Sequence, residues 1–332
     1  MFKQIFIERE SLNNKYTQNI LTYFKNIPTQ QIEKIEDIWG RSKRPYLQKR
    51  TDLNLFIGRK KGELIKKAPH AYGIDRGLHY YFIHAYNCIY ECQYCYLQGH
   101  FNTPDIVLFV NHDEIIQEMT RLLLENPAEE IWFHAGEFSD SLALSHITKE
   151  YDAYWKFFEL NPRAQLELRS KSVNTRELER LRPLGNVHIS FTISSAEQAK
   201  IYDLKCPSIK ARISAIKKLA LLGHKIGIHL DPLVINDHFE SEYQQLTSDL
   251  FTEVPVKQIS YVSIGVVRFT KDVFYEVKKN YPKSPYLAQD MIKSFDGKLR
   301  YPRPIRMWAI NKVRQMCIDY GVSESLIYRC ME

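Results

Sequence analysis

The stretch HYYFIHAYNCIYECQYCYLQ, residues 79–98, determines much of what this chain can be. Its first part is apolar and aromatic, which is typical of a buried strand. Its second part holds Cys88, Cys92 and Cys95 in the spacing C-x3-C-x2-C. Three thiolates on one tight loop can bind three irons of an iron–sulfur cube and leave the fourth iron open. An open iron can bind a substrate or cofactor, so the spacing predicts a catalytic cluster rather than one that stores electrons.

Other uses of these cysteines fit less well. A structural zinc site needs four ligands, usually two C-x2-C pairs, and the remaining Cys206, Cys317 and Cys330 are scattered. His84 or His100 could still serve as a fourth zinc ligand, so zinc binding stays open. A disulfide framework is typical of short secreted chains, whereas this chain has 6 cysteines in 332 residues. Ferredoxin-type clusters use four cysteines.

Three cysteines at this spacing, followed by an aromatic residue, resemble the signature of radical S-adenosylmethionine (SAM) enzymes. The resemblance implies a [4Fe-4S] cluster on Cys88, Cys92 and Cys95, with SAM chelating the open iron. One electron from the cluster would cleave SAM to a 5′-deoxyadenosyl radical, so the cofactor carries the difficult chemistry. An electron donor such as flavodoxin or ferredoxin would then be a partner.

Composition sets wide limits on function. Hydrophobic residues make up 44% of the chain, which is enough for a large core. No apolar run reaches the length of a membrane span, and the first residues lack the apolar segment of a signal peptide. With free cysteines and an oxygen-sensitive cluster, we expect a cytoplasmic protein without a membrane partner. The net charge of +7 is compatible with a nucleic-acid partner, although mildly basic enzymes are common.

The alternation of apolar runs with helix-length segments predicts an α/β fold. A small N-terminal α/β unit is expected over residues 1–75, with strands at 3–8 and 53–60 and a helix at 15–26. A parallel sheet of βαβ units is expected over 76–266, and a C-terminal extension richer in charge and helix over 267–332.

The strands expected in the parallel sheet are 79–85, 105–110, 130–135, 165–170, 186–193, 225–235 and 258–266. The helices expected between them are 112–125, 142–159, 174–182, 208–222 and 239–250. Sites in such sheets lie at the carboxyl ends of the strands. The cysteine loop directly follows the first of these strands, where that rule places a cofactor.

The motif CQYCYLQ, residues 92–98, resembles the spore photoproduct lyase family more closely than radical SAM enzymes in general. Further matches follow in order: FSD at 138–140, SKSVN at 170–174, ISFTIS at 189–194, residues 212–227, VRFTK at 267–271, and Tyr328. The resemblance implies a partial (β/α)6 barrel. It also implies an enzyme that acts on a thymine photoproduct or modified base in DNA, by hydrogen abstraction and carbon–carbon bond cleavage.

The resemblance also implies residues that would contact SAM. Ser139, Lys171 and Thr192 match the family's contact positions, and Asp231 stands near a backbone contact. A lysine would neutralise the carboxylate of SAM, and hydroxyls would hydrogen-bond to its polar groups. The structural alternatives are a solvated surface lysine at 171 and a helix N-cap at 139.

Two tyrosines flank the third cysteine. Tyr94 and Tyr96 match tyrosines that are thought to relay a hydrogen atom between a cysteine and SAM in the lyases. The alternative is that both rings simply pack around the cysteine loop.

The sequence departs from the family at Glu137, where the lyases carry the cysteine that donates a hydrogen atom. A carboxylate cannot donate a hydrogen atom as a thiol can. Glu137 could act as a general base or substrate ligand, or it could pair with a cation such as Lys171. Alternatively, Cys206 or Cys330 could supply the thiol, although buried free cysteines are more often inert.

Three histidines on predicted strands and two basic segments can be explained by structure alone or, for one segment, by nucleic-acid binding. Lone histidines on strands are usually satisfied core residues, which is what we expect of His134, His188 and His229. The basic loop 40–52 is expected to be plain surface. The run 298–308 interleaves cations with aromatics, as a phosphate-binding and base-stacking surface would, or as a solvated helix start would.

The leading hypothesis is therefore a radical SAM enzyme resembling spore photoproduct lyase. Two alternatives remain: a radical SAM enzyme acting on a small molecule or peptide, and a metal-bound nucleic-acid-binding protein without turnover.

Overall fold

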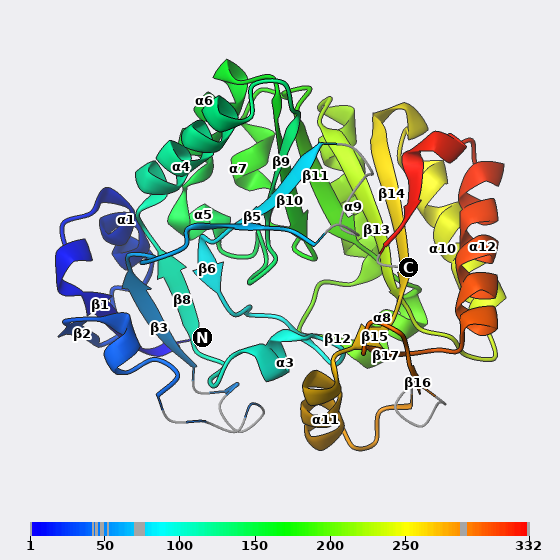
Figure 1. Cartoon of the computed structure of the whole chain (residues 1–332), viewed down its shortest axis with the longest axis horizontal. Coiled ribbons are helices and arrows are strands. Elements are labelled where there is room, and N and C mark those ends of the chain that lie inside the picture. Colours follow the sequence, from blue (N-terminus) through cyan, green and yellow to red (C-terminus); the bar gives the residue numbers. More distant parts are fainter. Residues whose placement is uncertain are drawn as a thin grey trace.

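The fold consists of two sheets with their helices and a C-terminal segment (Figure 1). The computed structural model describes residues 2–41, 43, 46, 50–51, 53–69, 77–285 and 291–330. The larger sheet has the strand order β18-β14-β13-β11-β10-β9-β5-β4. Its strands are β4 (Ile65–Lys67), β5 (Leu78–Phe82), β9 (Ile131–Ala135), β10 (Ala164–Ser170), β11 (Val187–Thr192), β13 (Lys225–Leu233), β14 (Ile259–Val266) and β18 (Ile327–Arg329).

All neighbouring strands of this sheet are parallel except β4 and β5. The six central strands, from β5 to β14, confirm the predicted partial (β/α)6 barrel. Both β9 and β11 are buried along their whole length. Their continuous apolar runs fit strands that are covered on both faces, as in parallel sheets generally.

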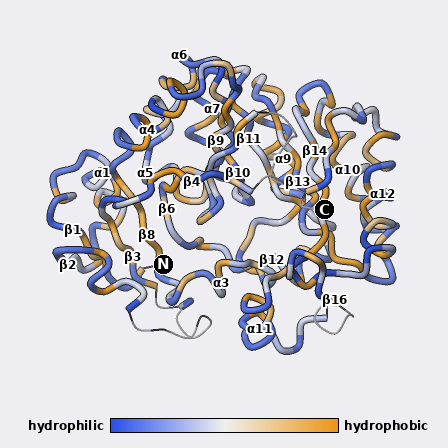
Figure 2. The backbone as a smooth tube through the Cα atoms, in the orientation of Figure 1, coloured by the Kyte–Doolittle hydropathy of each residue, from blue (hydrophilic) through white to orange (hydrophobic). Residues whose placement is uncertain are grey.

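Helices cover the outer face of the barrel (Figure 1). They are α4 (His112–Glu125), α5 (Ser145–Thr148), α6 (Tyr151–Leu160), α7 (Arg176–Glu179), α8 (Ala196–Tyr202), α9 (Ile209–Leu221) and α10 (Phe239–Glu253). In α4, Ile115, Met119 and Leu122 recur at helical spacing and are buried, while Asp113 and Glu114 favour the positive helix start. Figure 2 shows the same division, with hydrophobic strands inside and mixed helices outside.

The N-terminal sheet has the order β2-β1-β3-β8-β6. Its elements are β1 (Phe2–Glu8), α1 (Lys15–Tyr23), β2 (Thr29–Ile32), β3 (Leu53–Gly58), β6 (Ala85–Tyr86) and β8 (Ile106–Phe109). The strand predicted over 105–110 is present, but our placement of it in the barrel was wrong: β8 pairs with β3 and β6. Its apolar run indicates that the strand is buried, but it does not indicate which sheet the strand joins. The division of domains at residue 75 stays a prediction.

The C-terminal segment contains β15 (Arg268–Phe269), α11 (Lys271–Asn280), β16 (Ile292–Lys293), β17 (Leu299–Arg300) and α12 (Arg303–Asp319). The chain then returns to the barrel as β18, which pairs in parallel with β14. The predicted helices are present, and this returning strand is an addition that sequence reasoning did not predict. No described helix has both the length and the apolar character needed to cross a membrane.

The predicted cationic surface over 298–308 is not continuous. Arg300 and Arg306 are buried, and Arg300 pairs with Asp296. Trp308 is partly exposed and its ring packs against Phe239. Arg300 and Arg306 therefore cannot contact a phosphate backbone. Lys298, Arg303 and Trp308 are at least partly exposed, so a smaller phosphate-binding and base-stacking surface stays a prediction.

Candidate active site

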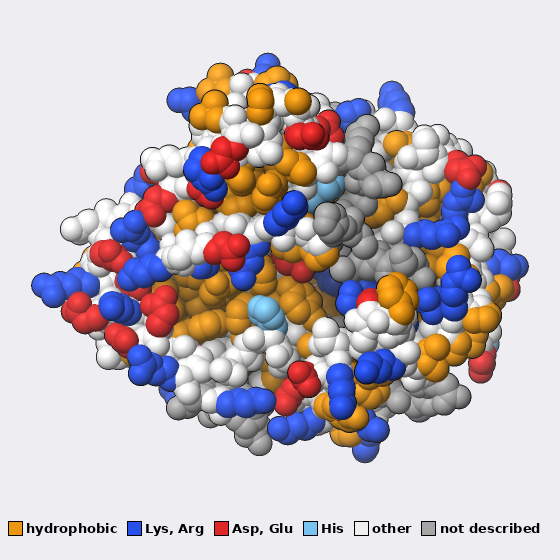
Figure 3. Space-filling model, in the orientation of Figure 1, with side chains coloured by type: hydrophobic (Ala, Val, Ile, Leu, Met, Phe, Trp, Pro, Cys, Tyr) orange, Lys and Arg blue, Asp and Glu red, His pale blue; other side chains and the backbone are white. Residues whose placement is uncertain are grey.

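A cavity of about 520 Å³ lies at the carboxyl ends of the barrel strands. Polar residues from successive strand ends line it: Glu137 after β9, Lys171 after β10, Thr192 at the end of β11, Asp231 in β13 and Arg268 after β14. In Figure 3 this face of the molecule is hollowed near its centre, with hydrophobic and cationic side chains around the hollow. Both the position and the size are usual for the ligand site of a parallel α/β barrel.

The cysteine loop forms one wall of the cavity. Cys88 follows β6, Cys92 lies in β7 (Glu91–Cys92) and Cys95 precedes α3 (Leu97–His100). Asn87, with a left-handed φ of 62°, begins the loop, and its buried Nδ2 donates to the carbonyls of Thr103 (2.7 Å) and Asp105 (2.8 Å). The loop is thereby tied to the N-terminal sheet.

Arg50 holds the loop from the other side. Its guanidinium donates to the carbonyls of Cys88 (3.0 Å), Ile89 (3.0 Å) and Tyr90 (2.6 Å), and its Nε lies 3.6 Å from the Glu91 carboxylate. Arg50 is 6% exposed, so our interpretation of it as plain surface was wrong. Arg44 and Lys49, which belong to the same basic loop, lie outside the described residues.

The three cysteines fit an iron–sulfur cluster. All are free thiols, and Cys92 and Cys95 face the cavity. The backbone N–H of Tyr90 donates to Cys88 Sγ (3.4 Å), and hydrogen bonds to sulfur are a common feature of such sites. Burial and then nearby negative charges, Cys92 and Cys95 among them, raise the pKa of Cys88. A bound cation would relieve this mutual repulsion by stabilising the thiolates.

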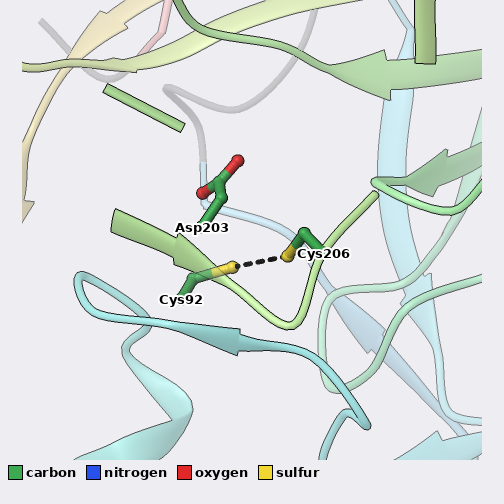
Figure 4. A group of neighbouring side chains, drawn as sticks. All are labelled: Cys92, Asp203 and Cys206. Atoms are coloured by element: carbon green, nitrogen blue, oxygen red, sulfur yellow. Dashed lines mark hydrogen bonds between the residues drawn. The ribbon is translucent and has the colours of Figure 1, made fainter. Parts of the chain in front are cut away.

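A second group of potential ligands adjoins the loop (Figure 4). The short strand β12 (Asp203–Leu204) pairs with β7, which brings Cys206 Sγ within 3.7 Å of Cys92 Sγ and Asp203 beside both. Asp203 is already neutralised by Lys171 and Arg212, so it is a poor ligand for an ion. This is the one described group of three with metal-ligand spacing, and it contains no histidine. Neither His84 nor His100 belongs to that group, and zinc binding stays an alternative.

Lys171 reaches the cavity from the end of β10, and 13% of its side chain is exposed. Its Nζ lies 3.1 Å from the Asp203 carboxylate and donates to Tyr94 Oη (2.6 Å), while Tyr94 in turn donates to Asp203. Arg212 pairs with the other carboxylate oxygen at 2.8 Å. The alternative of a solvated lysine was wrong. We name Cys88, Cys92, Cys95, Tyr94 and Lys171 the cysteine-loop group.

Glu137 is placed by a glycine turn at the end of β9. Gly136 has a φ of +93°, and a Cβ there would lie 2.7 Å from the Arg169 carbonyl, so the turn requires glycine. Burial raises the pKa of Glu137, although Arg169 and, less strongly, Arg268 counter it. Tyr96 Oη donates to the Glu137 carbonyl. Lys171 pairs with Asp203 instead, so the proposed ion pair between Glu137 and Lys171 was wrong.

Arg169 links the cavity to a buried polar network inside the barrel. Its guanidinium pairs with Glu167 (3.0 Å), which also accepts from His229 (2.7 Å), Tyr261 (2.7 Å) and His134. Burial alone would raise the pKa of Glu167, but Arg169 and His134 hold it well below its usual value. Of the histidines predicted to be structural, His134, His229 and also His188, which bonds Ser260 and Gln165, are buried and satisfied, as expected.

Asp231 and Arg268 form a two-pronged ion pair beside Glu137. Arg268 donates to Asp231 Oδ1 and Oδ2 at 3.0 Å each, and to Cys330 Sγ at 3.3 Å. Burial opposes ionisation of Asp231, but Arg268 more than offsets it and the pKa is lowered. We name Glu137, Arg169, Asp231, Arg268 and Cys330 the Arg268 group. Sequence reasoning missed the part that Arg169 and Arg268 play in the site, and it offered Cys330 as one of two alternative thiols.

Ser139 is the predicted SAM-binding residue that does not line this cavity. It borders a separate, smaller cavity with Asp140. Asp140 Oδ1 accepts from the N–H of Leu142 and Ala143, and Oδ2 accepts from the N–H of Lys171. The N-cap of α5 is Leu144, so the N-cap interpretation of Ser139 was wrong. A contact between Ser139 and SAM stays a prediction.

Comparison with known proteins identifies the family. The family model described as "Spore photoproduct lyase" matches residues 1–301. The chain belongs to the spore photoproduct lyase family. The spore photoproduct lyases of Geobacillus sp. and Bacillus subtilis are each 26% identical over 203 residues, which cover 60% of this chain and 60% and 59% of theirs. That of Clostridium acetobutylicum is 20% identical over 301 residues, or 89% of this chain and 87% of its own.

Solved structures of spore photoproduct lyase share the fold. A mutant with dinucleoside spore photoproduct has a TM-score of 0.86 at 20% identity, covering 99% of this chain and 98% of that one. A double mutant with bound AdoMet and dinucleoside spore photoproduct has a TM-score of 0.84 at the same identity and coverage. The family's barrel is thus present over nearly the whole length of this chain.

Proposed function

We propose that this protein is a radical SAM enzyme that acts on a thymine photoproduct in DNA. The observation that carries the proposal is a single cavity lined both by Cys92 and Cys95 of the C-x3-C-x2-C loop and by the Arg268 group. Membership of the spore photoproduct lyase family supports the same assignment. A radical formed at the cysteine loop would be released into the space that faces Glu137 and Arg268.

In this proposal, Cys88, Cys92 and Cys95 hold a [4Fe-4S] cluster, and SAM lies beside it. The cluster supplies the electron that cleaves SAM to the 5′-deoxyadenosyl radical. Lys171 would bind the SAM carboxylate, because it is the cation nearest the cysteine loop that lines the cavity. Thr192, at the neighbouring strand end, would add a hydroxyl contact, and the chain near Asp231 would contact SAM through its backbone, since the Asp231 side chain pairs with Arg268. One solved spore photoproduct lyase has AdoMet bound, which agrees with this assignment.

The lesion would occupy the part of the cavity lined by the Arg268 group. Two solved structures of spore photoproduct lyase hold dinucleoside spore photoproduct. Arg268 and Lys298 line the cavity here, and the net charge of +7 favours a polyanionic partner. Glu137 would hydrogen-bond an edge of the damaged base, because burial raises its pKa and makes the protonated, donating form more accessible.

The test is an anaerobic reaction of the reconstituted protein with SAM, a one-electron reductant and an oligonucleotide that carries the spore photoproduct. We expect 5′-deoxyadenosine and restored thymine with the damaged strand, and neither product above background with undamaged DNA. Binding of the damaged strand should weaken steeply with added salt, because phosphate contacts release counterions.

Two other outcomes would each favour another function. Deoxyadenosine without restored thymine, together with salt-insensitive DNA binding, would favour a radical SAM enzyme that acts on a small molecule or peptide. Zinc in place of iron, with no cleavage of SAM, would favour a metal-bound nucleic-acid-binding protein without turnover.

A further inference from the structure

The Arg268 group contains a thiol that the proposed function does not yet use. Cys330 lines the cavity together with Glu137, Asp231 and Arg268. Its backbone N–H donates to the Ile264 carbonyl of β14 at 2.8 Å, directly after β18 has paired with that strand. The last strand of the barrel therefore places this sulfur at the carboxyl end of the sheet, where the site lies.

The surroundings of Cys330 keep it a neutral thiol. Burial and, next, the adjacent Asp231 carboxylate raise its pKa to about 12, although Arg268 opposes the shift. Arg268 donates to the sulfur at 3.3 Å, and the thiol hydrogen-bonds to Asp231. Both contacts fix the direction of the S–H group. A protonated, oriented thiol beside a substrate cavity is suited to giving up a hydrogen atom and not to acting as a nucleophile.

The other described thiols lack one of these properties. Cys92 and Cys95 line the cavity but belong to the metal-binding motif. Cys206 contacts Cys92 and is not among the residues that line the cavity. Cys317 is fully buried in α12, away from the cavity. Among the described residues, Cys330 is therefore the cavity thiol outside that motif.

We propose that Cys330 is the hydrogen-atom donor that ends the radical reaction on the substrate; this inference rests on the proposed function. Abstraction of a hydrogen atom and bond cleavage leave a carbon-centred radical on the product base. The S–H bond of Cys330 breaks, one hydrogen atom moves to that carbon to form a C–H bond, and Cys330 becomes a thiyl radical. One electron from the external one-electron donor and one proton from water restore the thiol.

The decisive experiment compares Cys330→Ser with Cys317→Ser in D2O, using the damaged oligonucleotide. Serine keeps a polar group for Arg268 and Asp231 but has an O–H bond too strong to donate. We expect deoxyadenosine formation to stay within about threefold of the unaltered protein. Restored thymine should fall at least about tenfold, and the deuterium that the unaltered protein transfers to thymine should be lost. Cys317→Ser, which alters a thiol whose pKa is also raised to about 12 by burial, should keep both.

A second measurement tests whether the Cys330 thiol faces the bound substrate, and it does not require turnover. Small thiosulfonate reagents should modify Cys330 slowly in the folded protein, and dinucleoside spore photoproduct should slow this at least about tenfold while leaving Cys317 unchanged. Full repair and full deuterium transfer by Cys330→Ser would overturn the proposal and direct the search to the cavity tyrosines. Failure of the unaltered protein to form deoxyadenosine or restore thymine would instead overturn the proposed function.

Discussion

The two groups that line the cavity differ in how the chain builds them. Four members of the cysteine-loop group lie within the eight residues 88–95, and Lys171 reaches them through a contact with Tyr94. The Arg268 group is gathered from positions 137, 169, 231, 268 and 330, each at or near the end of a different barrel strand. The difference teaches that cofactor chemistry can reside in one short motif, whereas the substrate surface depends on the whole barrel.

The largest expected effect follows from removing a member of the cysteine-loop group. Cys92→Ala should reduce iron content and bring deoxyadenosine formation to background, because two thiolates from the loop cannot hold the cluster. Cys317→Ala is the matched control, since it removes a buried thiol far from the cavity and should keep both. Retained SAM cleavage in Cys92→Ala would mean that Cys206, at 3.7 Å, replaces the missing ligand or that the cluster assignment is wrong.

A change in the Arg268 group should separate the two groups. Asp231→Asn leaves Arg268, 16% of whose side chain is exposed, without its full charge partner, which we expect to cost about 2 kcal/mol at this site and to lower thymine restoration about 100-fold. Deoxyadenosine formation should change less than about threefold, because no member of the cysteine-loop group pairs with Asp231. Assaying both products of the same reaction tests this. An equal loss of both products would show that the two groups act as one unit.

A smaller effect is expected where the cysteine loop meets its support. Arg50→Lys keeps the charge but cannot reach three carbonyls at once, so the loop should become less ordered. We expect iron to be released about tenfold faster to a chelator, as for other residues that position metal ligands. The control is Arg41→Lys, which changes an exposed arginine that pairs with Asp37. Equal release rates in the two variants would contradict the supporting role of Arg50.

The smallest effect concerns stability and should affect both groups alike. Burial lowers the pKa of His112 to about 3 and, independently, that of His134 to about 4. Each is below the unfolded value near 6.5, so the unfolded chain binds more protons and stability falls as pH drops below 6.5. At pH 5, His112 alone should cost about 2 kcal/mol relative to pH 7.

Urea unfolding at pH 7 and pH 5 measures this. His112→Asn should show a shallower pH dependence than the unaltered protein, whereas His238→Asn, which changes an exposed histidine, should not. Glu150, whose pKa burial raises to about 7, acts in the opposite direction and is common to all three proteins. Identical slopes for His112→Asn and the unaltered protein would contradict the assigned burial effect.

The sequence predicts the cysteine-loop group well because spacing within one loop needs no knowledge of the fold. It also predicts the six central strands, since their apolar runs are long and regularly separated. It misplaced β8, because the apolar pattern of a strand does not show which sheet the strand joins. It missed the role of Arg50, because a basic loop looks the same whether a side chain meets solvent or a row of buried carbonyls.

The pairing of Arg268 with Asp231, and the route by which Cys330 enters the site, lay beyond sequence reasoning for a related reason. Cys330 reaches the cavity only because β18 pairs with β14, a contact that joins positions 65 residues apart at Val262 and Ile327. Arg268 stood in a matched motif, but its partner Asp231 is on another strand. Long-range pairings of this kind appear once the sheet order is known. The sequence does contain one signal: a charged residue directly after a predicted strand, as Arg268 follows the strand predicted over 258–266.

The most direct test of the account measures deoxyadenosine and restored thymine together, over time, in one anaerobic reaction of the reconstituted protein with the damaged oligonucleotide. The account predicts that both products appear and that Asp231→Asn lowers only the thymine. It would be contradicted if the unaltered protein cleaved SAM at the same rate with damaged and undamaged strands and restored no thymine, because the cavity would then not join the two groups in one reaction.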